Sequence, residues 1–244
     1  MFSRNELYWG SEMQKLLATK HVAVFGLGGV GGFCAEMLAR AGVGELTIID
    51  FDKVALSNIN RQIVALNSTI GQDKTSLFEL RLKDINPAIK INLIHDFYSE
   101  KLNQQILNFN PDFIADAIDT MRSKISLLDF SYNNQFPIIS SFGAGNRIAP
   151  EELYICDISD IEDKNSPFTS NILYRLKKRN IQKGINVVVS KEKPFSTDKV
   201  KIVENIKTQS GEEIEFAKII PASTPFVAST AGILMASFIV KNLV

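Results

Sequence analysis

The chain has 244 residues, enough for one sizeable α/β domain with elaborations or for two small domains. Hydrophobic residues make up 45% and charged residues 22%, which is ordinary for a soluble globular protein. Because 27 Lys and Arg balance 27 Asp and Glu, net charge does not attract nucleic acid, although a local basic patch is still allowed. Two cysteines, with no C-x-x-C, exclude a disulfide framework and a four-cysteine zinc site, and favour a reducing compartment.

Neither end of the chain predicts membrane insertion. The opening "MFSRNELYWGSEMQKLL" carries charges where a signal peptide needs an apolar core. The longest apolar run, residues 226–240, is short for a bilayer span and rich in Ala, Ser and Thr, so a packed helix is expected there. We therefore expect a cytoplasmic protein.

Strand and helix alternate along the first 145 residues. A β-branched strand at 20–26 leads into a glycine-rich turn, a helix at 30–42 and a second strand at 45–50, which is a βαβ unit. The further strands expected are 90–97, 113–119 and 136–143, and the further helices are 73–85, 99–109 and 122–134. This alternation predicts a Rossmann-like α/β fold, with a doubly wound, mostly parallel sheet covered on both faces.

The pattern changes after residue 150. Strands are expected at 152–158 and 185–190, a loop opening a helix at 165–180, and a final helix at 224–243. Residues 191–217 are lysine-rich with poor periodicity, which predicts an extended excursion or mobile loop. The final helix is too apolar to stand alone, so residues 1–150 (the ATP-binding core) and 151–244 (an α/β extension on the substrate side) are expected to share one core.

The turn "GLGGVGG" places Gly26, Gly28 and Gly31 at G-x-G-x-x-G spacing between strand and helix, and Gly29 lies within the same loop. Glycines let backbone N–H groups and a helix N-terminus approach phosphates, so the motif indicates nucleotide binding without separating NAD or FAD from ATP. Asp50, which closes the second strand, is placed to accept hydrogen bonds from a ribose. Asp52 fits either that site or a loop or helix-cap role.

The stretch "SNINRQ" then places four polar side chains next to this loop: Asn58, Asn60, Arg61 and Gln62. An arginine beside a phosphate loop is a bidentate phosphate ligand, which is more useful on a triphosphate than on a pyrophosphate already held by glycines. Lys74 lies near a helix start, where the dipole disfavours a cation unless an anion neutralises it, and we expect that anion to be phosphate.

Asp119 is the last residue of the expected strand 113–119, at the carboxyl end where ligands of open α/β sheets bind. Near phosphates and two cations its carboxylate is most simply a Mg²⁺ ligand, and the adjacent Thr120 is assigned to the same nucleotide site. A structural role is expected for Asp116, and also for His21 and His95, which lie in or beside strands. Together these residues suit attack of a carboxylate on the α-phosphate of ATP, giving an acyl-adenylate and pyrophosphate.

The run "GLGGVGG … LTIIDFDKVALSNINRQ … GQDK … DAIDT" resembles the ThiF/MoeB/HesA superfamily, which is similar to ubiquitin-activating enzymes and adenylates carboxylates. The opening "FSRNELYWG" also resembles the family, and there Arg4 matches an arginine that reaches into the partner subunit's ATP site. The resemblance therefore implies catalytic roles for Arg4, Arg61, Lys74 and Asp119, with ATP and Mg²⁺ as cofactors, in a homodimer.

Within the superfamily the chain is most similar to the tRNA threonylcarbamoyladenosine dehydratase branch, through "NINRQI", "INPAIKI" and "VVVSKEKP". That resemblance implies a tRNA substrate whose threonyl carboxylate, on a modified adenosine beside the anticodon, is adenylated before the ring closes. No DNA partner is implied. Five basic residues in "YRLKKRNIQKG" form a candidate tRNA-phosphate patch, against the alternative of a solvated helix face: Arg175, Lys177, Lys178, Arg179 and Lys183.

Other functions stay open on the sequence. A related adenylating enzyme activates the C-terminal glycine of a ubiquitin-like sulfur carrier, although many such relatives carry the paired C-x-x-C motifs that this chain lacks. An NAD-dependent oxidoreductase would use the glycine loop and Asp50 but would leave Arg61, Lys74 and Asp119 without roles. A non-enzymatic nucleotide-binding module is the third alternative.

Overall fold

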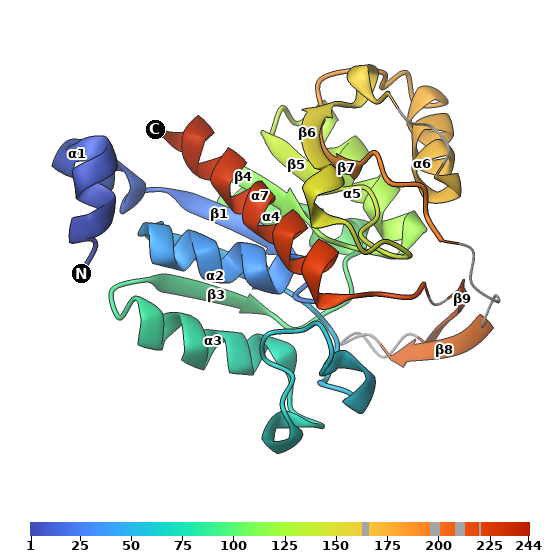
Figure 1. The fold of residues 1–244 in the computed structure, drawn as a ribbon, viewed down its shortest axis with the longest axis horizontal. Coiled ribbons are helices and arrows are strands. Elements are labelled where there is room, and N and C mark those ends of the chain that lie inside the picture. Colours follow the sequence, from blue (N-terminus) through green and yellow to red (C-terminus); the bar gives the residue numbers. More distant parts are fainter. Residues whose placement is uncertain (163–165, 196–200, 208–212, 220) are drawn as a thin grey trace.

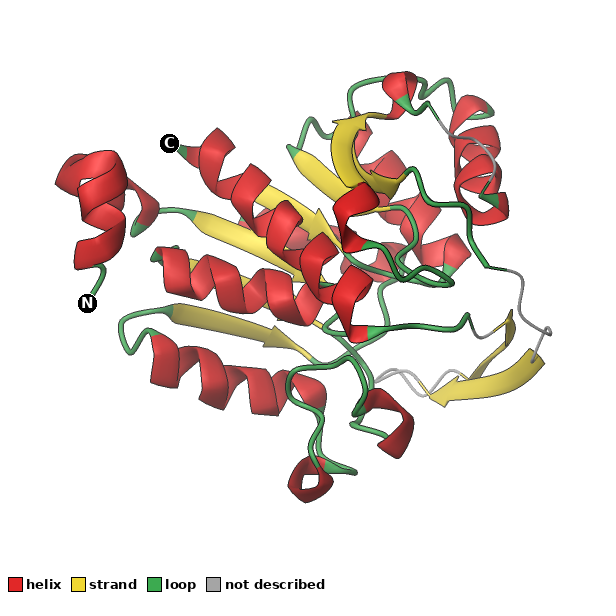
Figure 2. Ribbon diagram, in the orientation of Figure 1, coloured by secondary structure: helices red, strands yellow, loops and turns green. Residues whose placement is uncertain are grey.

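A seven-stranded sheet forms the centre of the protein (Figures 1 and 2). The computed structural model describes residues 1–162, 166–195, 201–207, 213–219 and 221–244. The strand order is β3-β2-β1-β4-β5-β7-β6, and every neighbouring pair is parallel except β6 with β7. In chain order the strands are β1 (His21–Phe25), β2 (Glu45–Ile49), β3 (Lys90–Ile94), β4 (Phe113–Asp116), β5 (Ile138–Ser141), β6 (Leu153–Asp157) and β7 (Asn186–Ser190).

Helices cover both faces of the sheet, as the alternating sequence predicts. Along β1, Val22 and Val24 enter one apolar cluster with α2, α3 and α7, whereas Ala23 and Phe25 enter a second cluster with α4, α5 and α6. Successive side chains of a strand point to opposite faces, so every residue of β1 is buried. The helices are α1 (Ser3–Leu17), α2 (Gly31–Ala41), α3 (Lys74–Ile85), α4 (Asn103–Phe109), α5 (Met121–Asn133), α6 (Pro167–Lys177) and α7 (Pro225–Leu243).

The C-terminal helix α7 returns to the N-terminal half and packs along α2 (Figure 1). The approach is close, because an added Cβ at Gly232 would collide with the carbonyl oxygen of Val30. By length and composition α7 is the one helix among the described residues that could cross a membrane, yet half of that apolar window is buried inside the protein. The expected packed helix is confirmed, and the division at residues 150 and 151 stays a prediction.

Two expectations about secondary structure were wrong. Strand β4 ends at Asp116, so Asp119 lies three residues further on, in the loop before α5. The excursion expected at 191–217 contains an antiparallel pair of strands, β8 (Lys201–Lys207) and β9 (Glu213–Ile219), which form a separate two-stranded sheet. Residues 196–200 and 208–212 of that excursion lie outside the described residues.

A buried carboxylate joins α2 to α3 on one face of the sheet. Glu36 is 3% exposed and accepts hydrogen bonds from Arg40 Nε at 2.8 Å and Arg81 Nε at 2.5 Å. Burial alone would raise the pKa of Glu36, but the bonds from Arg81 and Arg40 outweigh it and hold that pKa below its usual range. The ionised form is therefore the form that the fold favours.

We expect the free energy of unfolding of Glu36→Gln to fall less steeply between pH 5 and pH 3 than that of the wild type. Because the folded-state pKa is depressed, ionised Glu36 contributes stability above about pH 4.3, and this contribution is lost as the pH falls through the folded-state pKa. Urea unfolding at pH 7, 5, 4 and 3 measures the dependence, with Glu12→Gln in the exposed pair with Lys15 as the control. Parallel pH profiles for wild type and Glu36→Gln would contradict this assignment.

Candidate active site

The candidate site lies where the sheet reverses direction. From β1 the chain builds outward through β2 to β3, then returns to place β4 on the other side of β1. The carboxyl ends of β1 and β4 are therefore adjacent, and in open α/β sheets ligands bind at such a switch point. The loops that follow β1, β2 and β4 carry the residues that the sequence singled out.

The glycine loop after β1 is tightly built. Gly26 has φ +85°, donates its N–H to the Ile49 carbonyl at 2.8 Å, and would bring an added Cβ to 2.9 Å from the Ala117 carbonyl oxygen. An added Cβ at Gly31, the first residue of α2, would collide with the carbonyl oxygen of Gly26. Gly28 instead has open space around it, with only Gln62 Nε2 near, at 3.7 Å. Gly26 and Gly31 thus shape the turn, whereas Gly28 leaves backbone open to a ligand.

Asp50 holds this loop from the end of β2. Its Oδ2 accepts the Leu27 N–H at 2.6 Å, its Oδ1 accepts the Asp52 N–H at 2.7 Å, and the residue is 7% exposed. Burial raises the pKa of Asp50, and the ammonium of Lys74, 4.0 Å from Oδ1, opposes that rise. The carboxylate therefore fixes the glycine loop, while its expected contact with a ribose stays a prediction.

Lys74 begins α3 and is 3% exposed. Its Nζ lies 2.7 Å from Asp52 Oδ2 and 4.0 Å from Asp50 Oδ1. Lys74 is thus a cation at a helix N-terminus, as the sequence predicts. In this structure the carboxylates of Asp50 and Asp52 neutralise its charge. Phosphate as a further partner stays a prediction.

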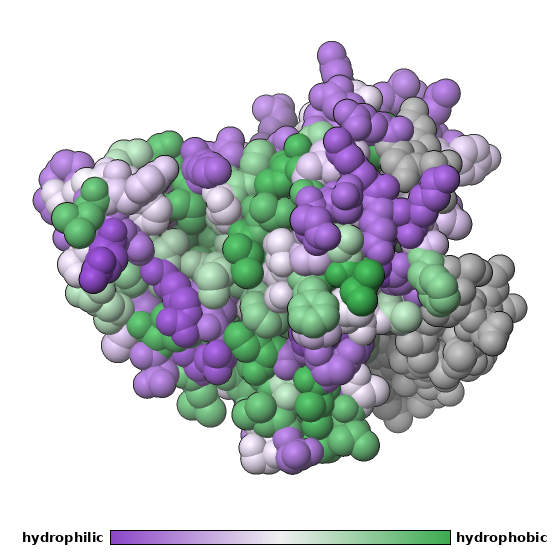
Figure 3. All heavy atoms as spheres, in the orientation of Figure 1, coloured by the Kyte–Doolittle hydropathy of each residue, from purple (hydrophilic) through white to green (hydrophobic). Residues whose placement is uncertain are grey.

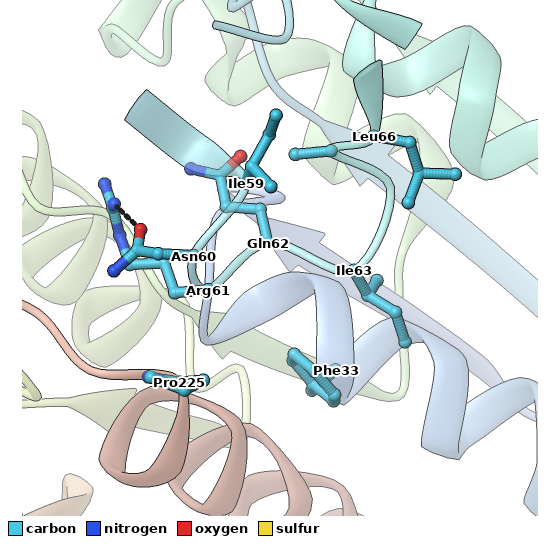
Figure 4. A pocket seen from close by; sticks show the side chains of 9 residues that line it. Phe33, Ile59, Asn60, Arg61, Gln62, Ile63, Leu66 and Pro225 are labelled. Atoms are coloured by element: carbon cyan, nitrogen blue, oxygen red, sulfur yellow. Dashed lines mark hydrogen bonds between the residues drawn. The ribbon is translucent and has the colours of Figure 1, made fainter. Parts of the chain in front are cut away.

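Residues 57–62 lie against the glycine loop. An added Cβ at Gly29 would be 3.2 Å from Arg61 Cγ and from the Arg61 carbonyl oxygen, so the two segments are in contact. Arg61 Nη1 donates to the Ser57 carbonyl and to Asn60 Oδ1, each at 2.9 Å (Figure 4). Burial lowers the pKa of Arg61, and the Asp119 carboxylate opposes this, which places Asp119 within electrostatic range.

Gln62 is the best sign that this segment meets a ligand. It is 8% exposed, and among the described residues its Oε1 has no hydrogen-bond partner. Asn58 instead caps its own turn by accepting the Ala55 N–H at 3.0 Å. A pocket of about 270 Å³ borders the segment (Figure 4). It is lined by Phe33, Ile59, Asn60, Arg61, Gln62, Ile63, Ala65, Leu66 and Pro225.

The loop after β4 carries Asp119, which is exposed, and Thr120, which occupies the N-cap position of α5 and donates to Asp119 Oδ1 at 3.4 Å. Beneath it Asp116 and Lys124 form a fully buried ion pair at 2.5 Å, and the Ser140 hydroxyl donates to the same carboxylate oxygen. The structural role expected for Asp116 is confirmed. Sequence reasoning missed Lys124, because nothing local marks a helix lysine as the partner of a strand aspartate.

Two groups of predicted site residues lie away from the loops. Arg4 is exposed on α1, and Asn5 beside it donates to the Arg40 carbonyl, so α1 is attached to the end of α2 opposite the glycine loop (Figure 1). The basic residues of the candidate tRNA patch are all exposed on α6 and the turn after it: Arg175, Lys177, Lys178, Arg179 and Lys183. His21 has the structural role expected, with its Nε2 2.8 Å from Thr47 Oγ1.

The fold and this arrangement define a Rossmann-like nucleotide-binding protein in which cationic side chains and a carboxylate flank the phosphate loop. The chain belongs to the ThiF family, whose model matches residues 2–150. It is 39% identical over 245 residues to a Bacillus subtilis tRNA threonylcarbamoyladenosine dehydratase, covering 99% of this chain and 94% of that protein.

The structure is similar to that of the Escherichia coli tRNA N6-threonylcarbamoyladenosine dehydratase solved in complex with ATP, with a TM-score of 0.84 and 27% identity over 99% of this chain and 93% of that one. A more partial match is the molybdopterin-synthase adenylyltransferase of Haemophilus influenzae, 37% identical over 128 residues, which are 52% of this chain and 51% of that protein.

We expect alanine substitutions at Gly28 and Gly31 to have different effects, one on ATP binding and the other on stability. We expect Gly31→Ala to lower the thermal midpoint by several degrees, because its Cβ meets the Gly26 carbonyl, an overpacking cost of about 1–3 kcal/mol. Gly28→Ala should unfold near the wild-type temperature but lose the stabilisation that ATP gives, since its Cβ points into open space. Thermal unfolding with and without ATP measures both. Equal midpoints for the two variants without ATP would refute this division of roles.

Proposed function

We propose that this chain is an ATP-dependent enzyme that adenylates the threonyl carboxylate of threonylcarbamoyladenosine in tRNA and so brings about its dehydrative cyclisation. The observation that carries the proposal is the likeness to a dehydratase over 99% of the chain, together with polar residues grouped around the glycine loop. In this reaction the carboxylate attacks the α-phosphorus and releases pyrophosphate. The neighbouring nitrogen then attacks the acyl carbon, closes the ring and releases AMP.

The protein's part in such a step is positioning and charge neutralisation. Backbone N–H groups at Gly28 and Gly29 approach the phosphates, and Arg61 and Lys74 neutralise their charge. Gln62 Oε1, which lacks a partner among the described residues, can only accept, so it would meet a donor such as a nucleotide hydroxyl and not a phosphate. Asp50 binds the ribose with the lone pairs that its backbone bonds leave free.

Asp119 would hold Mg²⁺, which would supply charge neutralisation at the phosphate oxygens. The fit is chemically sound, because Mg²⁺ is usually bound by one or two carboxylates together with substrate phosphates and water. Among the described residues no group of three His, Cys, Asp or Glu converges as a ready cation site, so a single exposed carboxylate suits a metal that arrives with the nucleotide.

Removing the two proposed phosphate and metal groups tests the adenylation step. We expect Lys74→Met and Asp119→Asn each to reduce pyrophosphate release by about 100-fold or more, as loss of one preorganised electrostatic contact does. The assay uses ATP with tRNA that carries threonylcarbamoyladenosine, and thermal unfolding confirms that each variant folds.

Matched controls are Lys53→Met, an exposed lysine in the loop after β2, and Asp160→Asn, an exposed aspartate beyond β6. Undiminished turnover in both site variants would sink the adenylation assignment. Release of pyrophosphate with a carrier protein ending in Gly-Gly, and none with tRNA, would instead transfer the function to sulfur-carrier activation.

We further propose a homodimer in which Arg4 acts in the partner's site. Within one chain α1 meets the end of α2 that is far from the glycine loop, so Arg4 does not serve its own loop. Leu7 and Tyr8 on α1 are 83% and 86% exposed, and a second exposed apolar set follows β2. These residues are Leu56, Ile59, Leu66 and Ile70, and Figure 3 shows hydrophobic surface along the lower edge of the molecule. Exposed apolar groups of this kind support burial against a second copy.

Mixed dimers test the action in trans. Co-expressed Arg4→Ala and Lys74→Met chains should recover about a quarter of wild-type activity, because half of the dimers are mixed and each has one intact site. Either variant alone should be nearly inactive. Activity of the mixture no higher than that of the separate variants would place Arg4 in its own chain's site or outside catalysis.

The exposed basic residues of α6 fit contact with tRNA phosphates in the cytoplasm. The side chains project from one helix and its C-terminal turn, and Lys178 lies 4.4 Å from the Tyr174 ring centroid. An exposed aromatic ring beside cations suits a backbone-and-base surface. The modified adenosine itself would be bound near the loops after β1 and β4, where the α-phosphate is expected.

A further inference from the structure

Asn60 connects the candidate phosphate-binding arginine to a distant part of the chain. Its Oδ1 accepts a hydrogen bond from Arg61 Nη1 at 2.9 Å, and its Nδ2 donates to the Ser223 carbonyl at 2.8 Å. The two partners lie 162 positions apart in the sequence. Figure 4 shows Asn60 and Arg61 directed toward one another, close to Pro225 at the start of α7. Asn60 itself is exposed, so its amide is committed to these two contacts without being needed for packing.

Asn146, in the loop after β5, makes two hydrogen bonds to the segment that Asn60 contacts. Asn146 donates its N–H to the Ala222 carbonyl and accepts the Ala222 N–H on Oδ1, both at 2.7 Å. Its own carbonyl accepts the N–H of Phe195 at 2.7 Å. Residues 195 and 222 flank the β8–β9 pair, so Asn146 fastens both chain segments that lead into and out of this hairpin.

The loop that carries Asn146 is itself well anchored. Arg147 is 6% exposed and donates to the carbonyls of Gly143 at 2.6 Å and Glu192 at 3.0 Å. Thr224 Oγ1 donates to the Arg147 carbonyl at 3.2 Å, which adds a second bond to the segment before α7. Segment 221–224 therefore has a defined position relative to the sheet. Because Asn60 bonds both this segment and Arg61, it holds the Arg61 guanidinium in a fixed position relative to the segment.

We propose that Asn60 is a positioning residue, which fixes the Arg61 guanidinium to segment 221–224 so that phosphate binding depends on how this C-terminal segment is docked. The physical reason is the Arg61 side chain: among the described residues, its guanidinium donates to the Ser57 carbonyl and to Asn60 Oδ1, and these bonds restrain its rotamers. Because coupling between sites is reciprocal, ATP at Arg61 also stabilises the docked position of segment 221–224. This proposal rests on the proposed function in one respect, that ATP is bound with its phosphates at Arg61.

A double-mutant cycle on ATP affinity tests the coupling. Asn60→Ala removes both amide bonds, and Asn146→Gly removes only the Oδ1 bond to Ala222, since glycine tolerates the φ of +60° found there. We expect each variant to weaken ATP binding by about threefold to fivefold, with the double variant no weaker than Asn60→Ala alone. Adenosine binding, which needs no phosphate contact, should be unchanged in all three.

Gln72→Ala is the matched control, because it also removes an exposed side-chain amide that bonds a carbonyl in the same loop, that of Ser68. If Asn146→Gly fails to fold, Thr224→Val releases the same segment by another bond. Losses of ATP affinity that multiply in the double variant, or an equal loss of adenosine binding, would overturn the positioning role. ATP binding by the wild type would in that case leave the proposed function standing. A wild-type protein that binds no ATP would overturn both.

Discussion

The arrangement of the site depends on one buried carboxylate. Asp50 accepts the Leu27 N–H, and through that bond the end of β2 fixes the glycine loop that follows β1. A buried carboxylate is tolerated only where donors and counter-charges surround it, and here the Asp52 N–H and the Lys74 ammonium complete the set. The start of α3 is therefore tied to the same point. The glycine loop, the loop after β2 and the start of α3 are therefore held in fixed positions relative to one another, because all three contact the Asp50 carboxylate.

The same electrostatic requirement recurs two strands further along the sheet, at the end of β4. Asp116 at the end of β4 is fully buried, and Lys124 and Ser140 satisfy its carboxylate. This pair fixes α5 and the loop between them, and with it the exposed Asp119, whose carboxylate acts on the pKa of Arg61. The buried charges thus set the positions of loops, whereas the exposed charges above them remain accessible to a ligand. The buried structural carboxylate of Asp116 and the exposed carboxylate of Asp119, the proposed Mg²⁺ ligand, are three residues apart.

Local pattern was sufficient for the fold class and for bringing together part of the candidate site. Strand alternation and the G-x-G-x-x-G spacing are nearest-neighbour signals, so the sheet, Gly26, Gly31 and Asp50 were predictable. The charge conflict at Lys74 was also visible, but the identity of its anion was not, because Asp52 lies 22 positions away in the sequence. Asn60 bonds Ser223, which is 163 positions away, and Asp116 bonds Lys124 and Ser140, which are 8 and 24 positions away, and no local period encodes such pairs. The β8–β9 pairing was missed for another reason: β9 begins with the alternating stretch EIEF, but β8 (KIVENIK) keeps no such period.

The two halves of the chain are matched by different relatives: the family model matches residues 2–150, and the dehydratase match covers 99% of the chain. The family model ends at residue 150 and so concerns the glycine loop and its flanking charges, and the match to the molybdopterin-synthase adenylyltransferase covers 52% of the chain. The likeness to the Bacillus subtilis dehydratase extends over 99% of the chain and therefore includes α6, the hairpin and α7. The residues proposed to bind the nucleotide lie within the family match at 2–150. We therefore expect the residues that recognise the tRNA substrate to lie in the second half of the chain, which the dehydratase match also includes. Because segment 221–224 bonds to Asn60 and α7 packs on α2, the second half also forms one wall of the site, so a likeness confined to the first half describes only part of it.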